Sequence, residues 1–369
     1  MTNVYSNPRH RVRYAAATAL LTLLGGAASA QSSVTIYGIA DVQLRHDRVA
    51  GTSLTSLGTG LSRGSRLGFN VVEDLGSGLM ALTVLEAGFD ADTGLVTANG
   101  APGAGFGRQS FVGLGSARTG ILALGRQYTP IFDLVGGALD PFGANYLGSI
   151  NTTFAFQGGM TGRSSNAISW TYGYATATDS PTPRNRFSAA LMYAPGEAAN
   201  SSHAGDYYSA AFGYGQDRWF VGYGAQQTRG SATAAPPSSL PRQTSQVIGG
   251  TYRFDAAMLF AAMLRTHNGA AGATSVQRTN WSLGARIPAP IGQVIVQYQR
   301  SNDRTPAQRD FSNFAVAYEY PLSKRTIAYV NYGRNFNDAT ANTSLNLGAL
   351  PVPVGADPSA FAIGVRHTF

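Results

Sequence analysis

Period-two alternation of side-chain type constrains this chain more than any other feature of its sequence. In sixteen segments of about eight to twelve residues, large apolar side chains alternate with polar or small ones. Successive side chains of a strand point to opposite faces, so each segment predicts a strand with one apolar and one polar face. The segments are 34–45, 65–73, 78–89, 108–115, 119–129, 167–174, 186–195, 206–215, 219–229, 243–254, 258–268, 278–288, 292–302, 309–321, 325–336 and 359–369.

The connections between these segments alternate between long and short. Short ones such as 74–77 and 322–324 have three or four residues, whereas 46–64 and 130–166 are much longer. Only 175–185 is too long for its place in this rhythm. Tilted strands of about ten residues can cross a bilayer, and single-chain outer-membrane barrels have an even number of strands. The pattern therefore predicts an all-β fold: a 16-stranded antiparallel transmembrane β-barrel with tight turns at one rim and long loops at the other.

The alternation also separates the side chains that would face lipid from those that would face water. A water-soluble β-sandwich has the same period with its polar face outward, and it remains an alternative. In a closed barrel the last segment would pair with both 34–45 and 325–336, leaving Phe369 at the lipid interface. The predicted lipid-facing residues of the first strand are Val34, Ile36, Gly38, Ala40, Val42 and Leu44, and those of 292–302 are Val294, Val296 and Tyr298.

The first thirty residues have the composition of an export signal rather than of a strand. Three arginines at positions 9–13 precede an apolar run at 15–24, and an A-x-A pattern follows at 28–30. This order is typical of a secretory signal peptide, and the apolar core is too short to span a membrane. We therefore predict a signal peptide over 1–30 and one barrel domain over 31–369. The alternative is an ordinary N-terminal core helix.

Composition excludes several ways of stabilising or anchoring the chain. There is no cysteine, so no disulfide can form, and the longest apolar run after residue 30 is 256–264, far below the ~20 residues of a spanning helix. Three of the 27 basic residues and none of the 19 acidic residues lie in 1–30, which leaves +5 on the mature chain. Only Lys324 is a lysine, so the positive charge is almost wholly guanidinium. This balance suggests an anionic partner, but no basic run or binding motif points to nucleic acid.

The residue types needed for catalysis are not arranged in a known pattern. Five histidines occur, none in a metal-ligand spacing, and no GxSxG or phosphate-binding loop is visible. We expect no catalytic residue, metal or cofactor. A barrel enzyme remains an alternative, since it would need only a Ser or Asp near a His at one depth of the wall. A barrel that serves as an adhesin or anchor would need larger external loops.

Several blocks of sequence resemble one family. They are YGIADV near the mature start, SRLGFNVVEDLGSGLMALTVLEAGF (65–89), GRQSFVGLGSARTGILALGRQYTP (107–130), LSKRT followed by Tyr329, and the closing GVRHTF. In their order and spacing these blocks are similar to the trimeric general porins of Gram-negative outer membranes, and the similarity covers nearly all of the mature chain.

The resemblance implies a function and a set of partners. It implies an integral outer-membrane channel for passive diffusion of small hydrophilic solutes and ions, assembled as a homotrimer through its first strands. It also implies that the third external loop, 130–166, folds into the lumen as a constriction, and that Phe369 belongs to a signal read by the barrel assembly machinery. A disordered external loop is the alternative for 130–166. A substrate-specific channel, for example for phosphate, is the alternative function.

The same resemblance implies the constriction residues. Arginines on the wall would be Arg66 and Arg108, and alternation supports both, because Leu67 and Phe111 would point to the opposite face. The other candidates are Arg126 and Arg163, the loop carboxylates Asp133 and Asp140, and Glu86, which would pair with lumen arginines. For each arginine the alternative is an exposed loop charge. The loop reads DPFG where the enteric branch of the family has Pro-Glu-Phe-Gly, and fewer loop carboxylates facing several arginines would favour anions.

Overall fold

A computed structural model of the chain describes residues 33–98, 101–102, 105–143, 145–150, 160–173, 187–197, 203–230, 242–268, 276–346 and 348–369. The predicted signal peptide lies outside these residues, as does the long connection 175–185. The strands are β1 (Ser33–Val49), β2 (Thr52–Thr59), β3 (Arg66–Gly76), β4 (Leu79–Phe89), β5 (Val96–Ala98), β6 (Ala101–Pro102), β7 (Gln109–Ser116), β8 (Gly120–Tyr128), β9 (Arg163–Tyr172), β10 (Phe187–Ala194), β11 (Tyr207–Gln216), β12 (Trp219–Arg229), β13 (Arg242–Arg253), β14 (Met258–Asn268), β15 (Gln277–Pro288), β16 (Gln293–Asp303), β17 (Phe311–Pro321), β18 (Thr326–Asn337) and β19 (Ser359–Thr368).

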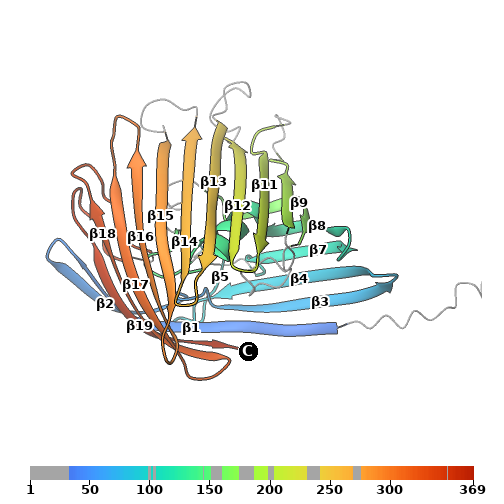
Figure 1. Ribbon diagram of the computed structural model, residues 1–369, viewed down its shortest axis with the longest axis horizontal. Helices are drawn as coiled ribbons and strands as arrows, with labels where there is room; N and C mark the ends of the chain where they lie inside the picture. The colour runs from blue at the N-terminus through green and yellow to red at the C-terminus, as the bar shows by residue number, and fades with distance from the viewer. Residues whose placement is uncertain are drawn as a thin grey trace, which may run out of the picture.

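These strands form one closed antiparallel sheet (Figure 1). β1 pairs with β3 through residues 33–39 and with β2 through 42–49, so β2 and β3 occupy one strand position. β5 and β6 form a short hairpin within a loop. The described strands therefore fill sixteen positions, and the pairing of β19 with β1 closes the barrel. The predicted fold class is confirmed, and each of the sixteen predicted segments corresponds to a strand.

The first loop differs from the prediction. Residues 46–64 were expected to form a long connection, but β1 continues to Val49 and β2 returns beside it. Ala50 and Gly51 both have positive φ angles, 46° and 80°, as a two-residue type I′ turn requires. β2 is rich in Ser, Thr and Gly, so its sequence has no apolar alternation to reveal the strand.

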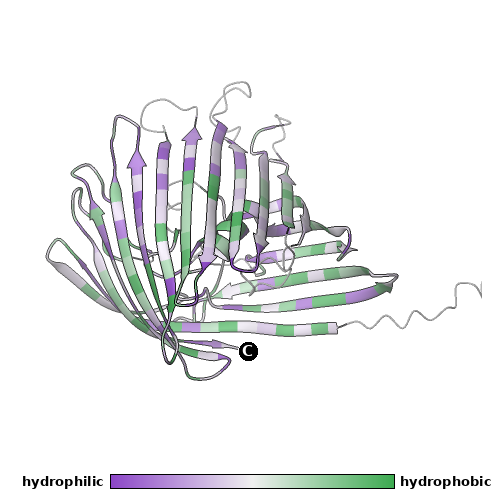
Figure 2. Cartoon of the chain, in the orientation of Figure 1, coloured by the Kyte–Doolittle hydropathy of each residue, from purple (hydrophilic) through white to green (hydrophobic). Residues whose placement is uncertain are grey.

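The apolar faces of the strands point outward. Val34 and Ile36 are 64% and 61% exposed, whereas Asp41, on the opposite face of β1, is fully buried. Exposed aliphatic and aromatic side chains continue around the outside, and Figure 2 shows hydrophobic residues along the strands. This orientation is that of a membrane barrel and excludes the water-soluble sandwich. Within the described part of the chain, no helix has the length and apolarity needed to cross a membrane.

The last strand, β19, closes the barrel with the pairing that the sequence predicted. β19 pairs with β1 and with β18. The Phe369 amide donates to the Gly38 carbonyl and the Gly38 amide donates to the Phe369 carbonyl, each at 3.0 Å. A Cβ on Gly38 would lie 2.3 Å from Cζ of the Phe369 ring, so the glycine provides the space in which the ring rests. The terminal ring therefore packs across the seam of the barrel.

The segment after β8 lies against the inner wall. It forms α2 (Pro130–Leu134), begun by a hydrogen bond from the Phe132 amide to the Thr129 hydroxyl, and a single π-helical turn, η1 (Val135–Leu139). Its apolar side chains form one buried cluster with inward-facing residues of β11–β14; the buried members are Ile131, Leu134, Val135, Leu139, Ile150, Met160, Ala211, Phe220, Val247, Ala262 and Leu264. Burial of this apolar surface attaches the segment to the wall.

Candidate pore constriction

The buried carboxylate of Glu86 on β4 is the centre of a charged cluster. Arg108 Nε donates to Glu86 Oε1 at 2.8 Å, and the Tyr37 hydroxyl donates to Oε2 at 3.0 Å. One terminal nitrogen of Arg66 lies 3.7 Å from Oε2. Residues from β1, β3, β4 and the segment before β7 thus meet at one carboxylate, and the predicted pairing of Glu86 with wall arginines is present.

A glycine on β3 makes this convergence possible. Gly68 pairs with Tyr37 on one side and with Glu86 on the other. A Cβ at position 68 would lie 2.3 Å from Cζ of Tyr37, so any larger residue would occupy the space of the phenol ring. The ring can cross β3 and reach the carboxylate on β4 because Gly68 has no side chain.

Arg163 joins the cluster through Tyr128 at the end of β8. The Tyr128 hydroxyl accepts hydrogen bonds from Arg108 and, at 2.7 Å, from Arg163. The Arg163 guanidinium carbon lies 4.4 Å from the centre of the Tyr128 ring, and Phe132 stacks on that ring with centroids 5.1 Å apart. The start of the inner segment is thereby joined to the charged cluster.

Arg108 reaches the cluster for a different reason from the predicted one. Phe111 pairs with Val84, which is buried on the same face as Glu86, so Phe111 does not point to the opposite face. Arg108 precedes β7 and its amide donates to the Glu86 carbonyl, which places its side chain beside that carboxylate. Arg108 therefore pairs with Glu86, although the alternation argument that placed Phe111 on the opposite face was wrong.

Arg126 is not brought into this cluster. Its Nε donates to the Gly107 carbonyl at 2.7 Å and a terminal nitrogen donates to the Ser165 hydroxyl at 2.8 Å. It follows the exposed Leu122 and Leu124 at every second position, next to a register shift in the pairing of β8 with β9. These contacts place Arg126 on the outward side of the wall.

The two predicted loop carboxylates have different environments. The Asp133 side chain in α2 is exposed within the lumen of the barrel. The protein that surrounds it there reduces solvation of the carboxylate and raises the pKa of the carboxyl to about 7, while the charge of Arg163 opposes the rise. Asp140 is buried: it accepts a hydrogen bond from the Phe142 amide at 2.9 Å and one from the Ser149 hydroxyl at 2.6 Å. Asp133 is thus exposed, whereas the carboxylate of Asp140 is bound within its own loop.

A second group of contacts, which the sequence did not reveal, fixes residues 141–148. The Tyr146 hydroxyl donates to Glu319 at 2.7 Å, and the Leu147 amide donates to the Asn331 side chain at 2.9 Å. Arg286 donates to the Pro141 carbonyl at 2.6 Å. Their polar side chains at inward positions of β15, β17 and β18 were the only sequence signal, and it does not say which loop they bind.

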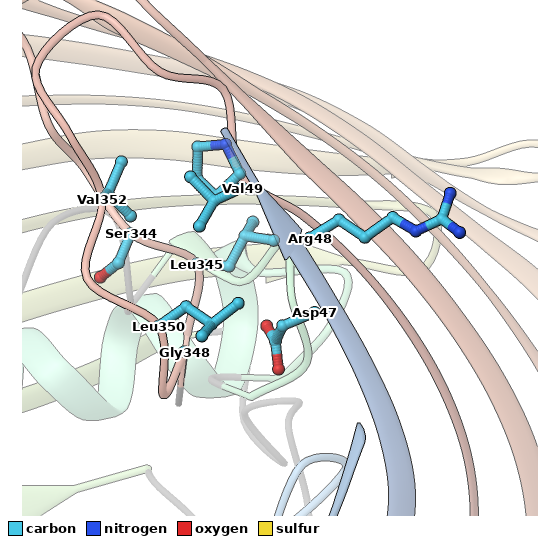
Figure 3. A pocket seen from close by; sticks show the side chains of 9 residues that line it. Asp47, Arg48, Val49, Ser344, Leu345, Gly348, Leu350 and Val352 are labelled. Atoms are coloured by element: carbon cyan, nitrogen blue, oxygen red, sulfur yellow. The ribbon is translucent and has the colours of Figure 1, made fainter. Parts of the chain in front are cut away.

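One small pocket lies outside the charged cluster. A small cavity between the end of β1 and the last loop is lined by Asp47, Val49, Leu345 and Leu350, among others (Figure 3). Its carboxylate is already bound by Arg45 at 2.6 Å. No group of three or more His, Cys, Asp or Glu residues suited to a metal ion occurs in the part of the chain that the structure covers.

The cluster of Arg66, Arg108, Arg163 and Glu86 combines three positive charges with one negative charge on the inner wall. In a narrow aqueous passage, such an arrangement orients dipolar solutes and changes the local concentration of ions.

Comparisons with known proteins agree with this geometry. A family model described as Gram-negative porin matches residues 16–340. An outer membrane porin protein of Bordetella pertussis is 27% identical over 96% of this chain and 98% of its own, and outer membrane porin protein 32 of Delftia acidovorans is 29% identical over 93% and 96%. The solved structure of an anion-selective porin from Comamonas acidovorans has a TM-score of 0.79 and 25% identity, covering 92% of this chain and all of the other. The chain belongs to the Gram-negative porin family and is an integral outer-membrane channel rather than an enzyme.

Proposed function

We propose that this porin is a passive diffusion channel with a weak preference for anions, set by Arg66, Arg108 and Arg163. The observation that carries the proposal is that two guanidinium groups pair with one carboxylate on the inner wall, and a third, that of Arg163, is joined to them through Tyr128. Arginine stays ionised at all relevant pH values, so this excess of positive charge is permanent. A solved porin similar over 92% of this chain is described as anion-selective, which supports the same preference here.

The size limit of the channel comes from the inner segment. Residues 130–150 contact the wall from β10 to β18 and so occupy part of the lumen. Small hydrophilic solutes and ions would pass through the remaining space, and bulky or apolar ones would be rejected.

The test is the reversal potential of the purified porin in a planar bilayer under a salt gradient. The wild type should favour chloride over potassium. The double variant Arg66→Ala with Arg108→Ala should lose this preference or reverse it, because Glu86 is then without its two guanidinium partners. Arg126→Ala removes the same type of charge outside the cluster and should leave the selectivity unchanged. An unchanged reversal potential in the double variant would contradict the proposal, and conductance that saturates with phosphate but not with chloride would favour a substrate-specific channel.

We further propose that the barrel forms a homotrimer through its first strands, is embedded in outer-membrane lipid, and is recognised by the barrel assembly machinery through Phe369. The apolar outward face of β1, on which Val34, Ile36 and Leu44 are exposed, supports packing of subunits, whereas Gly38 is covered by the Phe369 ring of the same chain. Channel openings should occur in steps of three, and removal of Phe369 should lower the amount of folded protein in the outer membrane. N-terminal sequencing of the mature protein should start at Gln31. Single-step openings would argue against the trimer.

A further inference from the structure

We propose that the outward face of β12–β14, at its loop end, binds the phosphate groups of the outer-leaflet glycolipid through Arg229, Arg242 and Arg265. The inference relies on the outer-membrane location and does not depend on the ion preference of the channel. It concerns the outside of the wall, away from the charged cluster of the lumen.

The three arginines belong to the lipid-facing series of their strands. On β13 the exposed Ile248 and on β14 the exposed Met263 alternate with the fully buried Val247 and Leu264. Counting in steps of two from the exposed residues leads to Arg242 and Arg265, which are both exposed. On β12 the same count from the exposed Trp219 leads to Arg229.

The positions of these arginines along the strands match the level of lipid headgroups. Trp219 and its partner Tyr252 form an aromatic row near the tight turns. Arg229 lies ten residues further along β12. At ~3.3 Å per residue and a tilt of ~40°, ten residues rise by about 25 Å, which is the height of the apolar band of an outer-membrane barrel. Arg229 and its register partner Arg242 therefore lie at the opposite boundary, where Figure 2 shows hydrophilic residues at the ends of β13 and β14.

Among the described residues, no carboxylate lies within ion-pair distance of these arginines. The nearest one along the chain pairing is Asp206, whose carbonyl accepts from the Arg229 amide, and its carboxylate is bound by the Gly196 amide and the Tyr208 hydroxyl. Arg229 and Arg242 are directly opposite each other, and like charges in that position repel. None of the three arginines forms an ion pair with a described residue, and Nε of Arg229 is enclosed without a hydrogen-bond acceptor in the described part of the chain. The two neighbouring loops, 230–241 and 269–276, contain no Asp or Glu in their sequences. An anion from outside the chain would compensate these charges.

Two outward arginines on other strands are paired with carboxylates of the protein. Arg300 on β16 pairs with Asp338 at 2.9 Å and with Asp310 at 3.3 Å. Arg334 on β18 pairs with Asp357 at 3.3 Å. Arg48 and Arg126 are also outward without a carboxylate partner among the described residues, but each stands alone on its strand. The distinguishing feature of β12–β14 is that three such arginines lie on neighbouring strands.

The depth of Arg265 favours a lipid over a dissolved phosphate. Arg265 pairs with Gln246, four residues from Arg242 along β13, which places its backbone about 10 Å deeper in the bilayer. A long arginine side chain at that depth extends toward the headgroups with its stem in the apolar layer. A headgroup that carries phosphates at the membrane boundary can contact both levels, and guanidinium groups bind phosphate through paired hydrogen bonds.

The test measures binding of bisphosphorylated lipid A to the detergent-purified porin by native mass spectrometry. Arg242→Gln with Arg265→Gln should weaken binding by at least about tenfold, because each removed group loses charge-assisted hydrogen bonds to phosphate. Arg334→Gln, which removes an outward arginine that is already paired with a carboxylate, should bind as the wild type does. Unchanged single-channel conductance and heat-modifiable migration would show that the variants are folded.

Two further arms identify the source of the phosphate. Dephosphorylated lipid A should bind the wild type no better than it binds the double variant, and inorganic phosphate at the same concentration should not displace lipid A. Equal binding of lipid A to wild type and double variant, an equal loss in Arg334→Gln, or displacement by inorganic phosphate would each overturn the proposal.

Discussion

Truncation of Leu134 should release the first part of the inner segment without unfolding the barrel. Leu134 is fully buried, and a Cβ on Gly222 or Gly224 of β12 would lie 2.5 Å or 3.2 Å from its methyl groups. Leu134→Ala therefore leaves a cavity between α2 and a wall that has only glycines at those positions. Because the wall is a closed backbone ladder, it cannot collapse onto the smaller side chain.

The size of this effect follows from the burial. A buried Leu→Ala change costs about 2–5 kcal/mol when the surroundings do not relax. In this protein the change lowers the free energy with which residues 130–139 dock on the wall. The ratio of docked to undocked segment should therefore fall by a factor of roughly 30 to several thousand. Residues 141–148 keep their contacts to Glu319 and Asn331, so the segment should be freed at one end only.

Single-channel recording and liposome swelling can detect this release. Leu134→Ala should show larger or noisier conductance and admit larger sugars, and the addition of Tyr146→Phe, which removes the hydrogen bond to Glu319, should increase the effect. Leu122→Ala truncates an exposed leucine on the outside of β8 and serves as the control. Conductance and size limit identical to the wild type, in a folded Leu134→Ala protein, would refute the idea that apolar packing holds the segment in place.

The remaining predictions concern charge and closure. As pH rises through about 7, Asp133 should ionise beside Arg163 and the anion preference should fall, and Asp133→Asn should remove this pH dependence of the reversal potential between pH 6 and 8. Glu86→Gln removes the carboxylate that faces the guanidinium groups, so the anion preference should increase. The reversal potential should shift further toward the equilibrium potential of chloride. Gly38→Ala would bring a methyl group to 2.3 Å from the Phe369 ring, so the temperature at which the folded form is lost in gel migration should decrease; overpacking of this kind costs about 1–3 kcal/mol.

The strand order was predictable because a membrane barrel imposes the same local rule on every strand. Lipid selects apolar side chains at alternate positions, so Ile248 and Met263 reveal their strands without any knowledge of their neighbours. β2 was missed because Ser53 and Thr55 take outward positions beside the single outward leucine, Leu57, so no apolar alternation is visible in its sequence. Sequence patterns thus identify strands where lipid contacts them, and lose them where water does.

The charged cluster was only partly predictable, because local irregularities decide where an arginine points. Regular alternation places Arg66 inward, and the structure agrees. Between Arg126 and Arg163, however, β8 and β9 shift register at Gly125, and Asn166 has a φ of 56°. One shift of this type moves a side chain to the other face, so the sequence could not tell which of the two arginines would reach Tyr128.

The attachment of the inner segment explains why the guanidinium groups lie where they do. Residues 130–139 pack on β10–β14 through apolar contacts, and residues 141–148 bind β15–β18 through hydrogen bonds. The segment therefore covers the wall from β10 to β19 and reaches the connection before β3, where the Tyr146 amide donates to the Leu61 carbonyl. In the described part of the chain, β3, β4 and β7 themselves form no hydrogen bond with it. Glu86 and its arginines project from these uncovered strands. We infer that solutes pass between the segment and this charged wall, so any mutation that loosens the segment should widen the passage and at the same time move ions away from the charges that select them.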